Sequence, residues 1–458
     1  MLKQGFIILL LINTLSADAR PAKVWTLDEC IRYAEAHSLD LRKHSLSYES
    51  DQVTLQESKW AFVPSIIASS NYSVSSGRVL DPTTYQFVET SFTGNSSSSI
   101  SGDIAIFEGG RKFFALQKAK LSLRASLLKE ESIKYNIKLN VIAAYVDVVC
   151  AKEQTEVAFQ SAALVKSRLR QSKVLLEAGN ITESDVLQLQ AQLYAAQNDI
   201  ASTEQSLQLA KLALCDLLEI EDYASFEVKL PEDIDVRTMP LDVGASIDNH
   251  PDYQLSLLNH KISLNDLCAA RSLLFPSLSL SAGYGSSFSD ARMKVLTNRD
   301  GTIKYEAYPF FRQYADNASV YVSAGLKIPI LSGLSTRNSV KRAKIAITES
   351  QLATLEVRKQ IRRTVIQAQM DCNAAWNRYL RAKEEVRYAE EAYRQIDEKY
   401  NFGATDFLSW NTAFVELAKA RYSLAESKYT YILKFNTSVK IYRTKKLNNG
   451  SRVTGSAI

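Results

Sequence analysis

The chain has few of the residues that interrupt regular secondary structure, since its 458 residues include only 16 glycines and 9 prolines. Both residues disfavour helix interiors, whereas alanine, leucine, lysine, glutamate and glutamine are abundant, so this composition favours long helices. No stretch approaches about 18 uninterrupted apolar residues, and we therefore expect no transmembrane helix. The net charge of +5 is small for this length and does not indicate a nucleic-acid partner.

Cysteine and histidine are also sparse, and neither is placed for catalysis or metal binding. The five cysteines are Cys30, Cys150, Cys215, Cys268 and Cys372, and the four histidines are His37, His44, His250 and His260. The cysteine spacings match no disulfide framework and no CxxC pair, so we predict small buried side chains while leaving any pairing open. Glycine-rich phosphate loops are missing too. We therefore predict no enzyme, no cofactor and no metal site.

The first residues have the layout of a secretory signal. Lys3 supplies a positive charge, Phe6–Ile12 forms a short apolar run, and Ala17-Asp18-Ala19 has the small-x-small pattern of a cleavage site. We predict a cleaved signal peptide over residues 1–19, which makes the chain an exported protein.

The remaining sequence repeats one plan in two halves. KWAFVPSI recurs as RSLLFPSL, so that Pro64 matches Pro276, and Gly179 in LEAGNITESD matches Gly403 in YNFGATDFLS. The predicted organisation is a first structural repeat over 20–240, a second over 241–442, and a C-terminal tail over 443–458.

Each half contains a long stretch without glycine or proline, from Gly110 to Gly179 and from Gly333 to Gly403. Small or apolar residues recur there at alternating spacings of four and three, which is the heptad pattern of coiled-coil packing. At about 1.5 Å per residue, each helix would be roughly 100 Å long, more than a compact domain needs. We predict two long helical hairpins, over 111–217 with its tip at Gly179 and over 335–439 with its tip at Gly403.

In front of each long helix the hydrophobic period changes to two, as in SLSLSAGYG. We predict strands at about 61–75 and 97–108, and at about 275–286 and 318–331, with the polar segments 75–96 and 285–319 as loops. Alternation over about ten residues is typical of the lipid-facing and lumen-facing positions of an outer-membrane barrel. A soluble antiparallel sheet with one wet face is the alternative.

Four strands cannot close a barrel, and an open edge is not tolerated in hydrocarbon. Other copies of the chain must therefore complete the sheet. Eight strands from two copies would leave an interior filled by side chains, whereas twelve from three copies would leave room for a pore. This favours a homotrimer in contact with outer-membrane lipid.

The order of motifs in both halves resembles the TolC-like outer-membrane efflux protein family. The resemblance is carried by TLDECIRYA, NHPDY, FVPS and LFPS before the strands, FEGG and LSGL after them, and the two glycine tips, and it covers Trp25 to Tyr442. It implies a mainly α fold with a trimeric 12-stranded β-barrel in the outer membrane and an α-helical barrel in the periplasm.

The resemblance also implies a function. Such proteins are passive exit ducts of tripartite efflux or type I secretion systems, joined at the helical tips to a periplasmic adaptor (membrane fusion protein) that connects them to an inner-membrane RND or ABC transporter. Short elements over Leu218–Val243 and beyond Val439 would form a belt at mid-height. The rival hypothesis is an exported periplasmic coiled-coil scaffold or adaptor without a channel, which would explain the heptads but not the paired strands.

The tips depart from the family at one feature. Members carry a ring of carboxylates after the second tip glycine, but Ser409 and Thr412 stand at those positions, and Thr405 replaces an arginine. The candidate residues for adaptor contact or gating are Gly179, Thr182, Asp185, Gly403, Thr405, Asp406 and Ser409. A capping box from Thr182 to Asp185 is an alternative role that is compatible with lining the pore.

Overall fold

The computed structural model describes residues 24–80, 85, 87–179, 181–229 and 243–442. The predicted signal peptide and C-terminal tail lie outside these residues. The chain divides into two compact units, each built from separate stretches of sequence. We call them the helical unit (Met1–His44, Glu130–Pro251 and Arg358–Ile458) and the sheet unit (Ser45–Lys129 and Asp252–Val357).

The helices of the two halves correspond in length. Helices α3 (Arg111–Glu177) and α8 (Ser335–Asn401) have 67 residues each, and α4 (Glu183–Leu218) and α9 (Phe407–Tyr442) have 36 each. The shorter helices are α1 (Leu27–His37), α2 (Leu39–Trp60), α5 (Val243–Asp248) and α6 (Pro251–Ser272). None of the helices in the described ranges is both long and apolar enough to cross a bilayer.

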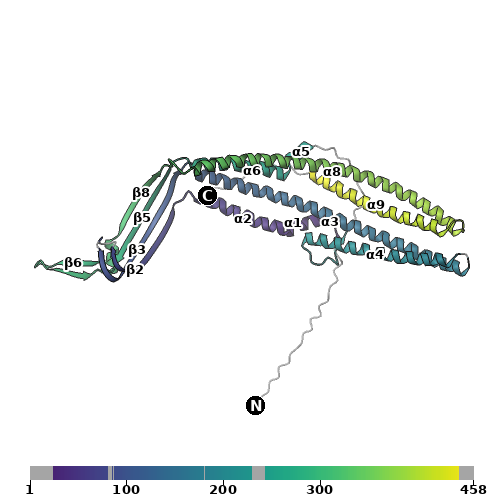
Figure 1. The fold of residues 1–458 in the computed structure, drawn as a ribbon, viewed down its shortest axis with the longest axis horizontal. Helices are drawn as coiled ribbons and strands as arrows, with labels where there is room; N and C mark the ends of the chain where they lie inside the picture. The colour runs from purple at the N-terminus through teal and green to yellow at the C-terminus, as the bar shows by residue number, and fades with distance from the viewer. Residues whose placement is uncertain (1–23, 81–84, 86, 180, 230–242, 443–458) are drawn as a thin grey trace, which may run out of the picture. The chain divides into compact units, whose positions relative to one another are not determined.

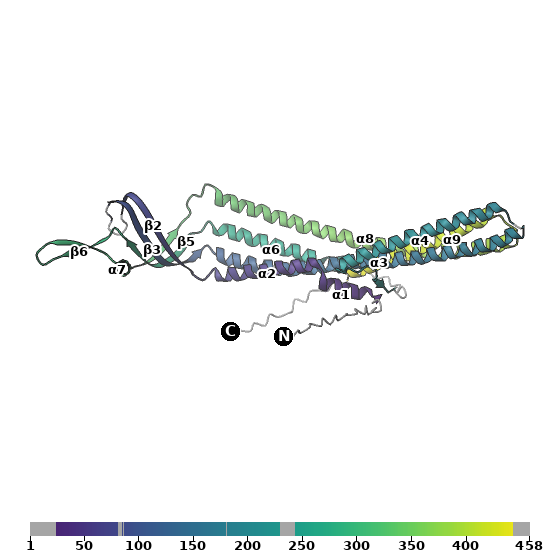
Figure 2. The same cartoon turned by 90° about the horizontal axis from the view of Figure 1, so that it is seen from below.

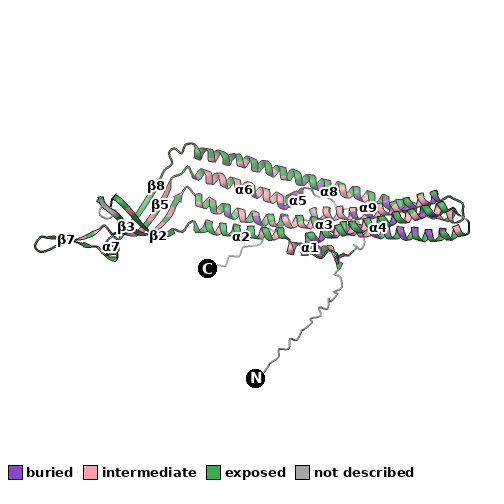
Figure 3. Ribbon diagram, turned by 60° about the horizontal axis from the view of Figure 1, so that its bottom comes forward, coloured by how far each residue is buried: buried purple, intermediate pink, exposed green. Residues whose placement is uncertain are grey.

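Small and branched side chains form the core of the helical unit. Val141, Val148 and Val149 of α3 pack with Leu214 and Cys215 of α4. Further buried residues of α3 and α4 extend this row of packed side chains, which we call the seam. The purple and green stripes along the helices in Figure 3 show this alternation of buried and exposed turns. The seam predicts close helix packing, since small residues allow backbones to approach.

A short two-stranded parallel sheet packs against this core through Trp25 and Val228. Strand β1 (Val24–Trp25) pairs with β4 (Glu227–Val228), and Lys152 and Lys211 each place an ammonium 2.8 Å from the Glu227 carboxylate. Burial raises the pKa of Glu227, but the hydrogen bonds and charges of the two lysines outweigh this, and its pKa is lowered. The rest of the predicted belt, beyond Lys229, lies largely outside the described residues.

The sheet unit contains four antiparallel strands in the order β2-β3-β5-β8 (Figure 1). Their bounds are Ser65–Leu80, Phe87–Glu108, Ser277–Ser289 and Ser319–Lys327. Strands β2 and β5 start directly after Pro64 and Pro276, positions where a proline interferes with no ladder hydrogen bond. Strand β8 ends before the predicted residue 331, because Pro329 has no N–H to donate to a ladder.

The predicted loop over 75–96 is wrong, whereas the predicted loop over 285–319 does connect β5 to β8 but overlaps them at its ends and contains secondary structure of its own. Most of segment 75–96 belongs to β2 and β3, which pair from Ser65–Asp103 to Leu80–Phe87 across a bulge at Ser75/Gly77. Segment 285–319 contains β6 (Met293–Thr297), β7 (Ile303–Ala307) and α7 (Phe310–Asp316). The serine- and threonine-rich segment of β2 and β3 forms strands because each strand satisfies the backbone hydrogen-bonding groups of the other.

The five cysteines all lie in the described ranges, and none of them forms a disulfide there. Cys30 and Cys215 are buried in the core of the helical unit, and Cys150, Cys268 and Cys372 are half-buried. Burial raises the pKa of both Cys150 and Cys215 to about 11, so these thiols are unreactive small side chains.

Candidate functional site

The first tip joins α3 to α4 through Gly179 and a capping box. Gly179 has φ +74°, and its N–H donates to the Leu176 carbonyl at 2.9 Å. Nothing lies within 4 Å of a Cβ built on Gly179, so the left-handed backbone, and not crowding, requires glycine here. The Thr182 hydroxyl and N–H both donate to the Asp185 carboxylate, at 2.8 and 3.1 Å. Asp185 therefore caps α4, as its sequence pattern predicted.

The second tip joins α8 to α9 through Gly403. Its φ is +70°, and its N–H donates to the Tyr400 carbonyl at 3.1 Å. Asp406 starts α9 by accepting from the Ser409 N–H at 2.9 Å, and hydrogen bonds from Ser409 lower the pKa of this exposed carboxyl. The Thr405 side chain is half-buried, while Asp406 and Ser409 are exposed.

The two tips lie side by side at one end of the helical unit, and both views show this (Figures 1 and 2). A shared core holds them together: Val165 and Leu169 of α3 and Leu189 of α4 pack with Trp410 and Phe414 of α9. All seven candidate residues therefore belong to one end of the unit. Among these seven residues, Asp185 and Asp406 carry carboxylates.

A buried cation between the hairpins was not predicted from the sequence. Arg168 of α3 is only 5% exposed, and its guanidinium carbon lies 4.5 Å from the Tyr400 ring centroid and 5.2 Å from that of Trp410. Its Nη1 donates to Asn401 Oδ1 at 2.5 Å, and its Nη2 lies 3.7 Å from Asp397. Asp397 also accepts from Trp410 Nε1 at 2.7 Å. We call these five residues the Arg168 cluster.

The Arg168 cluster had one usable signal in the sequence. Arg168 directly precedes Leu169, which belongs to the heptad pattern of the long helix. A helix that packs on one face only would leave the charged side chain at position 168 in solvent. An always-charged guanidinium is buried only when rings and acceptors surround it, and these come from the other hairpin. The cluster therefore ties the first hairpin to the second near both tips.

The sheet is the second candidate feature, because its two faces differ in chemistry. One face, here called the apolar face, carries aligned rows such as Ala68–Ile100–Tyr284–Val320 and Ile66–Gly102–Ala282–Val322. The opposite face, here called the polar face, is dominated by serine and glycine, including the row Ser69–Ser99–Gly285–Ser319. Ile66, Val320 and Val322 are 75%, 75% and 70% exposed, so the protomer alone leaves apolar side chains in contact with solvent.

The histidines have ordinary partners. His37 Nδ1 lies 2.9 Å from the Tyr33 carbonyl, His260 Nδ1 lies 2.8 Å from the Ser350 hydroxyl, and His250 is buried against the ring of Tyr135. Within the described ranges no three His, Cys, Asp or Glu side chains are grouped as metal ligands would be.

Comparison with known proteins gives concordant results. Residues 30–218 and 243–437 match the family model described as outer membrane efflux protein. The sequence is 23% identical over 323 residues to the outer membrane protein TolC of Vibrio cholerae, with 70% of each chain covered. The fold is similar to the outer membrane protein VceC of Vibrio cholerae (TM-score 0.75, 14% identity, 91% of this chain and 95% of that one). It is also similar to the CmeC outer membrane channel of Campylobacter jejuni (TM-score 0.77, 15% identity, 91% and 85%).

Proposed function

Because this chain belongs to the outer membrane efflux protein family, we propose that it is the exit duct of a tripartite efflux or type I secretion system. The membership confirms the family resemblance and places the protein in the outer membrane as an efflux channel. In the proposed role the duct conducts passively, and an inner-membrane RND or ABC transporter supplies the energy through a periplasmic adaptor.

The observation that carries this proposal is the open four-stranded sheet. Among the described residues, its two edge strands, β2 and β8, each pair with a strand on one side only, and its apolar face is exposed. Unpaired strand edges are not tolerated in hydrocarbon, so other copies of the chain would have to pair with them. An exposed apolar face is unfavourable in water, and contact with lipid would remove that cost. Three copies would close a 12-stranded barrel with the apolar face toward lipid and the polar face toward a water-filled lumen.

The experiment is assembly and conductance of the full chain purified from outer membranes. We expect a trimeric mass, a heat-sensitive shift in gel migration, and single-channel conductance in planar bilayers. A soluble periplasmic species without conductance would contradict the duct and favour a coiled-coil scaffold.

The tip residues Gly179, Thr182, Asp185, Gly403, Thr405, Asp406 and Ser409 are proposed to contact the adaptor or to line the entrance. Asp185 is the sharpest case, because its carboxylate both caps α4 and would attract cations if three copies surround a pore. Asp185→Asn should reduce the cation preference of the channel. Thr182→Ala is the matched control, since it breaks the capping box but keeps the charge. Equal selectivity in both variants and wild type would restrict Asp185 to capping.

A further inference from the structure

Helices α2 and α8 continue the two edge strands of the sheet. Helix α2 ends at Trp60 and β2 begins at Ser65, while β8 ends at Lys327 and α8 begins at Ser335. Within the sheet unit, α3 and α6 lie between these two helices, so α2 and α8 form its margins (Figures 1 and 3). Copies of the chain that join at the sheet edges therefore place α2 of one copy beside α8 of the next.

The outer face of α2 carries exposed apolar side chains at heptad spacing. Leu46, Val53 and Trp60 follow one another at intervals of one heptad, and each is more than half exposed. Tyr48 and Leu55 each follow one of these residues by two positions, which places them about 200° around the helix, and they are half-buried. Helix α2 therefore packs with one side in its own copy and leaves a second apolar row, here called the α2 stripe, in solvent.

Helix α8 is organised in the same way where it belongs to the sheet unit. On one side, the Ser350 hydroxyl lies 2.8 Å from His260 Nδ1 of α6, and the Thr354 hydroxyl donates to the Ser256 carbonyl at 3.3 Å. The opposite side carries a row of apolar residues that are each at least half exposed, and this α8 stripe consists of Ile345, Leu352 and Leu355. Both margins thus present an unoccupied face for coiled-coil packing.

The charges beside the two stripes have opposite signs. Glu49 and Glu57 lie three or four residues from members of the α2 stripe, and therefore on the same face. In the first four turns of α8 every charged residue is a cation, and its carboxylates begin only at Glu349; these cations are Arg337, Lys341, Arg342 and Lys344. Among the residues that the structure describes, neither the two glutamates nor the four cations form an ion pair within their own copy.

The direction of the two helices brings these opposite charges to the same level. Helix α2 runs toward the sheet and α8 runs away from it, so they meet antiparallel, as β2 and β8 would. At about 1.5 Å per residue, Val53 lies about 10 Å from the sheet end of α2 and Ile345 about 15 Å from that of α8. Glu49 and Glu57 flank Val53 by one turn, and Lys341 precedes Ile345 by one turn. Acidic and basic positions therefore face each other across the two stripes.

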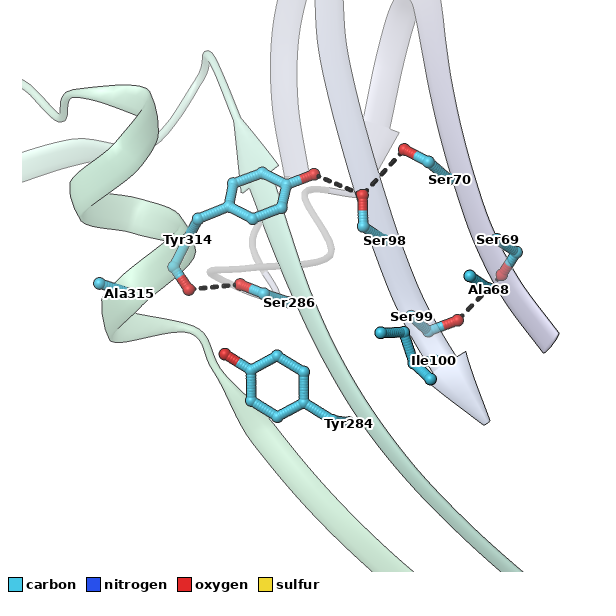
Figure 4. Close-up of a pocket in the computed structure, with 10 residues that line it drawn as sticks. All are labelled: Ala68, Ser69, Ser70, Ser98, Ser99, Ile100, Tyr284, Ser286, Tyr314 and Ala315. Atoms are coloured by element: carbon cyan, nitrogen blue, oxygen red, sulfur yellow. Dashed lines mark hydrogen bonds between the residues drawn. The ribbon is translucent and has the colours of Figure 1, made fainter. Parts of the chain in front are cut away.

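The sheet itself offers little that distinguishes one partner chain from another. Backbone groups at a strand edge pair with any sequence. Beside α7 the hydroxyl groups are already bonded to one another: Ser286 donates to the Tyr314 carbonyl at 2.6 Å, and the Ser98 hydroxyl lies 2.8 Å from that of Ser70 (Figure 4). The stripes of α2 and α8 and the charges beside them are thus the part of the margins that can recognise a particular chain.

We propose that α2 of one copy and α8 of the next form a charge-matched antiparallel coiled coil, which selects a second copy of this chain as the neighbour. The inference rests on the proposed function, in which copies close the sheet, and it adds the side chains that decide which chain can join. The two stripes fill the contact, and the glutamates of α2 meet the cations of α8. Charges beside a coiled-coil contact set partner choice and orientation, because like charges placed opposite each other repel.

The test is charge reversal on each helix of the full-length protein, measured as the yield of trimer from outer membranes. Glu49→Lys with Glu57→Lys should lower this yield about tenfold, because cations then face cations. Lys341→Glu with Lys344→Glu should also lower it about tenfold. The combined variant with all four reversals should recover the yield, which a variant that merely misfolds would not do.

The control places the same charge change on a helix between the margins. Lys261→Glu with Arg271→Glu reverses two exposed cations of α6 and should leave the trimer yield unchanged. Wild type and the combined variant, co-expressed with different tags, should form separate trimers. Mixed trimers at the statistical frequency would overturn the proposed selection.

A cross-link keeps the test informative if the reversed variants fail to assemble. Val53→Cys with Ile345→Cys should give covalently linked copies on oxidation, whereas the native cysteines alone should not. A conducting trimer in which this pair forms no link, or in which reversal on α2 leaves the yield unchanged, would overturn the helix pairing and leave the duct intact. A wild-type protein that neither forms trimers nor conducts would overturn both.

Discussion

The Arg168 cluster allows a prediction with a magnitude. Asp397→Asn keeps an oxygen that can accept from Trp410 Nε1, but it removes the negative charge 3.7 Å from the Arg168 guanidinium. Breaking a buried ion pair by removing one partner costs about 3–5 kcal/mol. Here the Asp397 side chain is 29% exposed and the contact is longer than a hydrogen bond, which places the cost lower, at about 2–3 kcal/mol.

This cost should appear at the tips and not throughout the molecule. Hydrogen exchange followed by mass spectrometry on the assembled protein should show faster opening of peptides around Gly179 and Gly403, by about 30- to 150-fold. The double variant Arg168→Met with Asp397→Asn removes the stranded charge and should recover much of the loss. Unchanged exchange in Asp397→Asn, or a double variant as labile as the sum of the single ones, would refute the coupling.

Three further outcomes follow from the helices and their ends. Ala375→Pro, in the buried seam of α8, should cost about 3 kcal/mol per copy and sharply reduce the assembled yield; normal yield would contradict a continuous helix. Thr182→Ala should cost about 1 kcal/mol at the first tip by loss of the capping box, measured as local exchange. The pKa of Asp406 is lower in the folded state than in the unfolded state. Its contribution to the stability of the tip is therefore complete at a pH above the unfolded-state pKa and is lost as the pH falls through the folded-state pKa. After correction for the intrinsic pH dependence of amide exchange, the protection of the Ser409 N–H should therefore fall on acidification in wild type but not in Asp406→Asn.

The long helices could be predicted because their signal is repeated many times. A stretch without glycine or proline and an unbroken heptad each point to the same element, and Gly179 and Gly403 mark where a left-handed residue must end it. The family followed from the order of such features in two halves, and the family match confirms it. A periodic pattern is therefore sufficient to predict an element when the same spacing of residue types continues over many residues.

Features set by partners distant in sequence could not be predicted. The pairing of β2 with β3 through the serine-rich segment depends on a partner strand and not on local hydrophobicity. Arg168 is buried by Tyr400 and Trp410, more than 200 positions away, and Gln313 takes the place of a strand beside Ser289. Each of these features depends on tertiary contacts of polar groups, and such contacts leave no periodic pattern in the sequence.

The central claim is that the two faces of the sheet meet lipid and water respectively, and neighbouring positions on β5 test it most directly. Ser281 belongs to the polar face and Ala282 to the apolar face. Planar-bilayer reversal potentials and outer-membrane yield should be measured for Ser281→Lys and Ala282→Lys. The account predicts that Ser281→Lys assembles and shifts selectivity toward anions, whereas Ala282→Lys loses assembly at a cost of up to about 2–4 kcal/mol per copy. Normal assembly of Ala282→Lys, or unchanged selectivity in Ser281→Lys, would contradict it.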